Sequence, residues 1–259
     1  MISPGARLLT LGAAVLALAG CSATTPGPSE PGTGTEAAAT TDVRCADLVV
    51  LGARGSTQDP DLNAGVGTEV RRTTDELARR LHGRSGLTVR IEAIRYDAGA
   101  TATSAAYQQH TLEGTRMMLS RLRTLASRCA ESHFALVGFS QGAQVVHGAA
   151  ADMPGDLAGR VVLVAMIADP LRDPTDAIAH WSYAEEPTRG NGRLGAGPPI
   201  SAALRAAAIS LCVEGDEICN ARGAPGDPPS EVHKHFYERP AAVRATAARL
   251  DAVLRRNGV

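Results

Sequence analysis

The stretch HFALVGFSQGAQVV, residues 133–146, passes from an apolar run typical of a buried strand into a helical pattern, with Ser140 at the junction. A serine at such a junction can be the N-cap of the helix, because its hydroxyl accepts hydrogen bonds from free backbone N–H groups. Residues 138–142, GFSQG, also match G-x-S-x-G, the strained strand-to-helix turn that exposes a nucleophilic serine. Because the chain holds 27 glycines, such a match can arise by chance, and its surroundings must decide between the two interpretations.

Near-continuous runs of Val, Ile and Leu, typical of strands buried on both faces, occur in five segments. They are residues 47–53, 87–94, 133–139, 160–167 and 207–213. Between them, residues 68–81 and 114–128 repeat apolar side chains at helical spacing, and Pro240 begins a last helical pattern. This alternation predicts a doubly wound α/β fold, in which helices flank a mainly parallel five-stranded sheet.

The first 41 residues differ in composition from the rest. Arg7 precedes an apolar run too short to cross a bilayer, and the run ends in LAGC at residues 18–21. This ending resembles a bacterial lipobox, which implies a signal peptide over residues 1–20 and lipidation of Cys21. An ordinary secretory signal is the alternative.

Residues 22–41 are rich in Ser, Thr, Pro and Gly, so we expect a flexible linker there and one folded domain over residues 42–259. The expected location is outside the cell, either anchored by lipid at the outer face of a bacterial membrane or secreted.

The charge of the chain argues against nucleic-acid binding, and its cysteines indicate disulfides. The formal net charge is −1 and no basic tract occurs, whereas nucleic-acid-binding proteins carry a clustered basic surface. No segment indicates an obligate protein partner. The cysteines beyond Cys21 are even in number, which in an exported chain predicts two disulfides with three open connectivities. They are Cys45, Cys129, Cys212 and Cys219.

Ser140 follows the end of a predicted strand, where parallel α/β sheets collect their catalytic groups. A serine becomes a nucleophile when an imidazole takes its proton and a carboxylate orients that imidazole. Asp216 and then His233 and His235 follow Ser140 in the chain order that α/β-hydrolases use. Asp169 also ends a strand and is a rival acid, although an Asp-Pro turn explains it equally well.

Four motifs occur in one order along the chain: CADLVVLGARGST at 45–57, GFSQGA at 138–143, CVEGDEIC at 212–219, and a histidine followed by aromatics at 233–237. Together they resemble the cutinases, most closely the cutinase-like esterases of actinobacteria. The resemblance implies that Ser140 is the nucleophile and Asp216 the orienting acid. It also implies disulfides Cys45–Cys129 and Cys212–Cys219, and an oxyanion hole made by the N–H of Gln141 with the N–H and hydroxyl of Ser56.

Two features depart from the family pattern. The pattern of a histidine with an aromatic three residues later favours His233, with Phe236, as the base; His235 is the alternative, with Tyr237 in a looser match. Residues 180–205, which contain Trp181, read as a glycine-rich insertion longer than compact fungal cutinases carry, so substrate preference does not transfer directly.

We therefore predict a serine carboxylesterase or lipase of cutinase type that hydrolyses lipid or polyester esters through an acyl-enzyme. No metal or organic cofactor is expected, because the serine mechanism requires none. Read as zinc ligands, HKH at 233–235 lacks further ligands at the usual spacing. The alternatives are a phospholipase, thioesterase or acyltransferase with the same triad, and a surface lipoprotein that binds lipid without turning it over.

Overall fold

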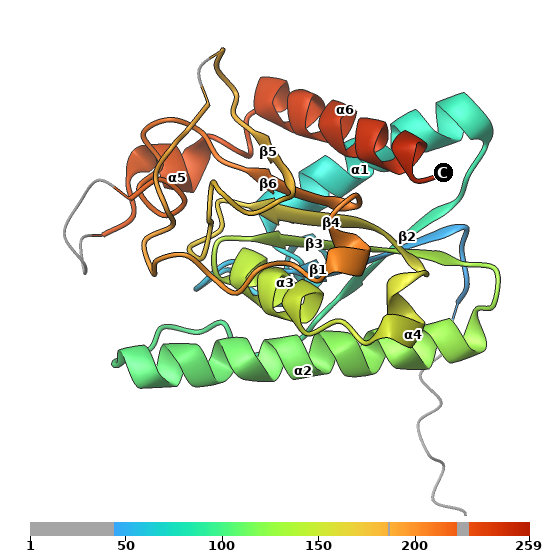
Figure 1. Cartoon of the computed structure of the whole chain (residues 1–259), viewed down its shortest axis with the longest axis horizontal. Helices are drawn as coiled ribbons and strands as arrows, with labels where there is room; N and C mark the ends of the chain where they lie inside the picture. The colour runs from blue at the N-terminus through green and yellow to red at the C-terminus, as the bar shows by residue number, and fades with distance from the viewer. Residues whose placement is uncertain (1–43, 186, 222–227) are drawn as a thin grey trace, which may run out of the picture. The chain divides into compact units, whose positions relative to one another are not determined.

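The computed structural model describes residues 44–185, 187–221 and 228–259 (Figure 1). The predicted signal peptide over 1–20, the lipidation of Cys21, the linker to residue 41 and the start of the domain at residue 42 lie outside the described residues. Within the described part, no helix is both long and apolar enough to cross a membrane.

A six-stranded sheet forms the centre of the domain, and every neighbouring pair of strands is parallel. The strand order is β2-β1-β3-β4-β6-β5. In chain order the strands are β1 (Leu48–Ala53), β2 (Val89–Ala93), β3 (His133–Phe139), β4 (Val161–Ile167), β5 (Ala179–Trp181) and β6 (Ala208–Leu211). The predicted doubly wound α/β fold is confirmed.

Two details of the sheet differ from prediction. A sixth strand, β5, overlaps the start of the segment at 180–205 read as an insertion from the sequence. With three residues, this strand is too short to show an apolar pattern in the sequence. The prediction that β2 is buried on both faces was also wrong. This strand lies at an edge of the sheet, and its residues are only partly buried.

Four long helices cover the sheet, α1 and α6 on one face and α2 and α3 on the other (Figure 1). They are α1 (Thr68–Ser85), α2 (Ser104–Arg128), α3 (Gln141–Ala151) and α6 (Pro240–Arg256). Short helices α4 (Gly155–Ala158) and α5 (Glu231–His235) and the 3-10 turns η1 (Asn63–Gly65) and η2 (Ala202–Leu204) complete the described part.

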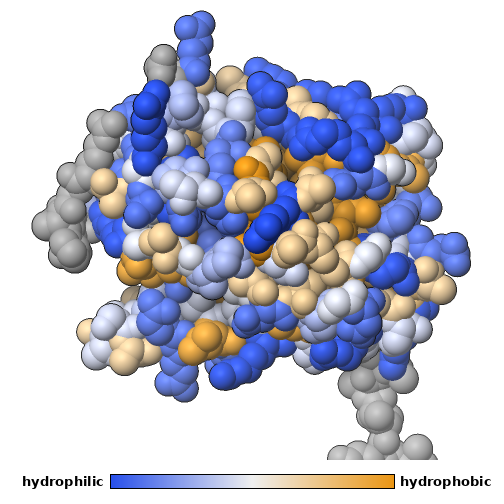
Figure 2. Space-filling view, viewed as in Figure 1, coloured by the Kyte–Doolittle hydropathy of each residue, from blue (hydrophilic) through white to orange (hydrophobic). Residues whose placement is uncertain are grey.

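The apolar core lies in two layers, one on each face of the sheet. Met118, Leu122 and Leu125 of α2 pack in one layer, and Val70 and Leu77 of α1 pack in the other, all fully buried. Helix α2 begins ten residues before the predicted segment at 114, since its first turns are largely exposed and carry little apolar periodicity. On the outer surface shown in Figure 2, polar and apolar side chains are interspersed, as is usual for a folded domain.

The two disulfides that the resemblance implies are present. Cys45–Cys129 joins the chain before β1 to the end of α2, with 5.5 Å between the Cα atoms. Cys212–Cys219 closes a short loop after β6, with 5.8 Å between the Cα atoms. Because all strands run in one direction, the loops after β1, β3, β4 and β6 meet at one edge of the sheet.

Candidate active site

Ser140 occupies a strained turn between β3 and α3. Its φ of 53° and ψ of −119° lie in a region that non-glycine residues rarely adopt. Although Ser140 is at the N-cap position of α3, its side chain makes no capping hydrogen bond there. The hydroxyl is 3.1 Å from His233 Nε2 instead.

The two glycines around Ser140 are needed for close packing. A Cβ at Gly138 would lie 2.1 Å from the carbonyl oxygen of Gly142, and a Cβ at Gly142 would lie 2.1 Å from that of Ala53. Both distances are far inside van der Waals contact. The G-x-S-x-G pattern therefore has a steric reason here, which a chance match would lack.

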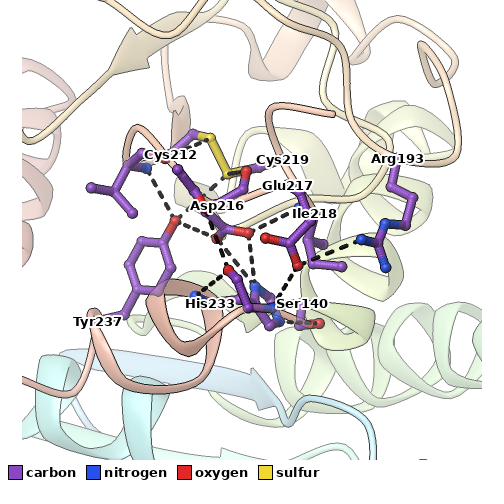
Figure 3. A network of polar contacts seen from close by, with 12 residues as sticks. Ser140, Arg193, Cys212, Asp216, Glu217, Ile218, Cys219, His233 and Tyr237 are labelled. Atoms are coloured by element: carbon purple, nitrogen blue, oxygen red, sulfur yellow. Dashed lines mark hydrogen bonds and ion pairs between the residues drawn. A yellow bond between two sulfur atoms is a disulfide. The ribbon is translucent and has the colours of Figure 1, made fainter. Parts of the chain in front are cut away.

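His233 lies between Ser140 and Asp216 (Figure 3). Its Nδ1 is 3.0 Å from Asp216 Oδ1 and 3.1 Å from Oδ2, while its Nε2 faces the Ser140 hydroxyl. Because an ionised carboxylate only accepts hydrogen bonds, Nδ1 carries the proton and Nε2 is free to accept one from Ser140. This is the arrangement that a serine nucleophile, a general base and an orienting acid require.

Local structure fixes the imidazole of His233. Helix α5 begins with Ser230 as N-cap, and the Ser230 hydroxyl accepts a hydrogen bond from the His233 N–H at 3.2 Å. The Phe139 ring stacks on the imidazole with 5.0 Å between ring centroids. The backbone and the ring plane of His233 are thus both held before any substrate binds.

The Asp216 carboxylate is fully buried and is held at both oxygens. Oδ1 accepts from the Ile218 N–H at 2.9 Å, and Oδ2 accepts from the Tyr237 hydroxyl at 2.7 Å. The Tyr237 oxygen in turn accepts from the Val213 N–H at 3.1 Å, and burial together with the charge of Asp216 raises the Tyr237 pKa well above its usual value. Sequence reasoning missed this contact, which no spacing rule indicates.

His235, the alternative base, points elsewhere. Its side chain is 55% exposed and faces two carboxylates, at 3.4 Å from Glu231 and 3.2 Å from Glu238. The structure brings His233, and not His235, to Ser140.

Asp169, the rival acid, is buried beside another histidine. His147 Nδ1 lies 2.6 Å from Asp169 Oδ2, and its Nε2 lies 2.8 Å from the carbonyl oxygen of Pro198. Because a carboxylate and a carbonyl oxygen are acceptors, this pair of contacts favours a ring that is protonated at both nitrogens. Burial lowers the His147 pKa, but the hydrogen bond and charge of Asp169 outweigh it, and the net shift is upward.

The turn after β1 approaches the nucleophile from the other side. The Ser56 hydroxyl donates to Gln141 Oε1 at 2.8 Å, which ties this turn to the start of α3. As the first residue of the helix, Gln141 has a backbone N–H with no acceptor inside the helix. Arg54 lies beneath the turn and donates to the carbonyl oxygens of Tyr96 at 2.8 Å and Gln58 at 3.1 Å.

A cavity of about 730 Å³ opens beside Ser140 and His233. Much of its wall is apolar, built from Tyr107, Phe139, Pro170, Leu194, Ile218 and Pro229. Leu194 belongs to the segment read as an insertion, so part of that segment does form the site wall. Trp181 does not line the cavity; it lies in β5 against Tyr183, with 4.2 Å between ring centroids.

Comparisons with known proteins identify the family of this chain. A family model described as Cutinase matches residues 44–247. A cutinase from Kineococcus radiotolerans is 33% identical over 136 residues, which cover 49% of this chain and 42% of that protein. Carboxylesterase Culp1 from Mycobacterium tuberculosis is 27% identical over 179 residues, covering 69% and 71%. The fold of a Trichoderma reesei cutinase in complex with a phosphonate inhibitor superposes with a TM-score of 0.55 at 21% identity, covering 81% of this chain and 77% of that one.

Proposed function

The chain belongs to the cutinase family of carboxylic ester hydrolases, and we propose that it cleaves esters with Ser140, His233 and Asp216 through a covalent acyl-enzyme. One observation carries the assignment: His233 bridges the Ser140 hydroxyl at 3.1 Å and the buried Asp216 carboxylate at 3.0 Å. The exposed His235 has neither contact, which supports His233 as the base.

In the proposed reaction, Ser140 Oγ attacks the ester carbonyl carbon while His233 Nε2 takes the hydroxyl proton. The carbonyl oxygen becomes an oxyanion, and the backbone N–H groups of Gln141 and Ser56 stabilise it. The Ser56 hydroxyl supports the turn, since it donates to the Gln141 side chain. When the C–O bond to the alcohol breaks, the leaving oxygen takes the proton from His233. Water then attacks the acyl-enzyme by the reverse route and releases the carboxylic acid.

The apolar cavity wall supports substrates with an apolar group next to the ester, as in lipids or polyesters. The relatives named cutinase and carboxylesterase support the same class of carboxylic ester. A phospholipid or a thioester would present the same kind of acyl carbonyl to Ser140. Product analysis on each substrate separates these activities from one another and from acyl transfer to an alcohol.

We extend the proposal to the protein's location. Two disulfides favour folding in an oxidising compartment. The lipobox-like LAGC at 18–21 supports a lipid anchor on Cys21 at the outer face of the cell membrane.

A pre-steady-state burst assay with p-nitrophenyl butyrate tests the mechanism on the full chain. We expect a burst of one p-nitrophenol per enzyme that Ser140→Ala abolishes. His233→Ala should lose nearly all turnover, while the matched variant His235→Ala should keep it. Turnover that survives Ser140→Ala, or that is lost in His235→Ala alone, contradicts the assignment; a folded parent without turnover on any ester favours a lipid-binding lipoprotein.

A further inference from the structure

Glu69 is a buried carboxyl group that the proposed mechanism does not use. It is the second residue of α1, only 4% exposed, and it lines the same cavity as Ser140. Buried glutamates are rare unless a partner compensates for the lost solvation. The partner of Glu69 Oε2 is a neutral amide, Gln58 Nε2, at 2.6 Å. Burial raises the Glu69 pKa.

Gln58 closes the turn that carries Ser56. Its side-chain Oε1 accepts from the Gly55 N–H at 2.7 Å, and its own backbone N–H donates to the Gly55 carbonyl oxygen at 3.4 Å. Because the Gly55 N–H can only donate, the amide must turn Oε1 towards it and Nε2 towards Glu69. The hydrogen bonds therefore run in one direction, from Gly55 through Gln58 to Glu69.

This turn needs support, because its backbone is strained. Thr57, directly after Ser56, has a φ of 62°, which is unfavourable for a β-branched residue. Room for the supporting amide comes from Gly67, where a Cβ would lie 2.0 Å from Gln58 Oε1. The strain at Thr57 and the space left by Gly67 independently indicate that the Gln58 side chain occupies a fixed position against this turn.

We propose that Glu69 is a positioning residue for the reaction: its carboxylate holds the Gln58 amide, and through it the turn that directs the Ser56 N–H at the ester oxygen. The inference rests on the proposed function, in which that N–H belongs to the oxyanion hole. Removing one oxyanion donor costs about 10²- to 10³-fold in kcat. Glu69 substitutions leave both partners of the Gly55–Gln58 hydrogen bond in place. We therefore expect a smaller loss, about tenfold, from misplacement of the turn alone.

A carboxylate in the first turn also stabilises a helix through its dipole, so the test must separate positioning from stability. Glu76 provides the matched control. It is a glutamate of the same helix, 7% exposed, with ion pairs to Arg79 at 2.6 Å and Arg80 at 3.1 Å, and it does not line the cavity. Glu76→Leu should lower the free energy of unfolding and leave kcat unchanged.

The experiment measures kcat and KM for p-nitrophenyl butyrate, and the inactivation rate by diethyl p-nitrophenyl phosphate, whose P=O oxygen takes the place of the ester oxygen. In Glu69→Leu we expect kcat to fall about tenfold with KM within about twofold, and inactivation to slow by the same factor as kcat. Glu69→Gln keeps an acceptor oxygen and should restore kcat to within about threefold of the parent. The double variant with Gln58→Leu should be no slower than Gln58→Leu alone, because both changes act through one contact.

Parent-like kcat in Glu69→Leu, an equal kcat loss in Glu76→Leu, or additive losses in the double variant would each overturn the inference. If Glu69→Leu does not fold, kcat and the inactivation rate are compared between Gln58→Leu, Glu69→Gln and the parent instead. A parent that the phosphate does not inactivate through Ser140 contradicts the proposed function itself. A parent that it does inactivate, with Glu69→Leu reacting at the parent rate, contradicts only the role of Glu69.

Discussion

Tyr237→Phe isolates one contact of the buried acid. The substitution removes a single hydroxyl and leaves the ring, which packs 5.7 Å from Phe139 and 5.5 Å from Phe236 between centroids. The hydroxyl has two strong hydrogen bonds that would be lost, the one donated to Asp216 Oδ2 at 2.7 Å and the one accepted from the Val213 N–H at 3.1 Å. A weaker contact with Cys219 Sγ at 3.6 Å is lost with them. The two residues that would lose their partner, Asp216 and Val213, are both buried.

The magnitude follows from the chemistry of those two bonds. A hydrogen bond to an ionised group contributes about 1.5 to 3 kcal/mol, and a buried N–H left without an acceptor costs about 1 to 3 kcal/mol. We therefore expect the free energy of unfolding to fall by about 3 kcal/mol. Activity should fall less, because Asp216 keeps the Ile218 N–H and His233; a loss of about tenfold in kcat corresponds to about 1.4 kcal/mol.

Tyr183→Phe is the matched control. Tyr183 packs 5.7 Å from Tyr237 between centroids, but its hydroxyl bonds Thr246 Oγ1 at 2.6 Å rather than Asp216. Removing it should cost about 1 kcal/mol of stability and leave kcat unchanged. Urea denaturation and steady-state kinetics measure both effects. Parent-like stability in Tyr237→Phe, or the same fall in kcat in both variants, would refute the reasoning.

Two further predictions concern the histidine beside Asp169 and the disulfides. Because the folded-state pKa of His147 is raised, its stabilisation is complete below the unfolded pKa of about 6.5 and is lost as the pH rises through the folded pKa. Urea denaturation should show a larger stability difference between parent and His147→Gln at pH 6 than at pH 9, and a constant difference would contradict the imidazolium. Replacing Cys212 and Cys219 by Ala should cost about 2.5 kcal/mol of stability, and replacing Cys45 and Cys129 about 4.5 kcal/mol, since the second pair closes the longer loop. Only the first replacement should also lower kcat, because its loop holds the buried acid; a larger kcat loss in the second would contradict this.

Local patterns predicted most of the fold. Strands β1, β3, β4 and β6 carry near-continuous apolar runs, and helices α1 and α6 carry apolar side chains at helical spacing, so neighbouring residues suffice to identify them. Strand β5 has three residues and no such pattern, and it forms because Ala179–Trp181 can pair beside β6. The partial burial of β2 depends on its place at the edge, which is a property of the sheet and not of the strand.

For the candidate site, the sequence indicated the residues that carry a motif and not those that support them. Ser140 lies in a pentapeptide whose glycines are sterically required. Tyr237, Glu69 and His147 act through contacts 21, 11 and 22 residues away in the chain. No spacing rule links such partners, and a buried tyrosine or glutamate is equally compatible with many pairings before the fold is known.

The choice between the two histidines of HKH depends on the local fold as well as on the sequence pattern. Residues two apart on a helix point about 200° apart, so His233 and His235 cannot both face Ser140 once α5 forms. The start of the helix then decides between them. Ser230 as N-cap bonds the His233 N–H, while Phe139 stacks on that ring and Glu238 faces the other. A five-residue helix has too few turns to predict its start from periodicity, and so the choice of base needed the tertiary contacts of β3.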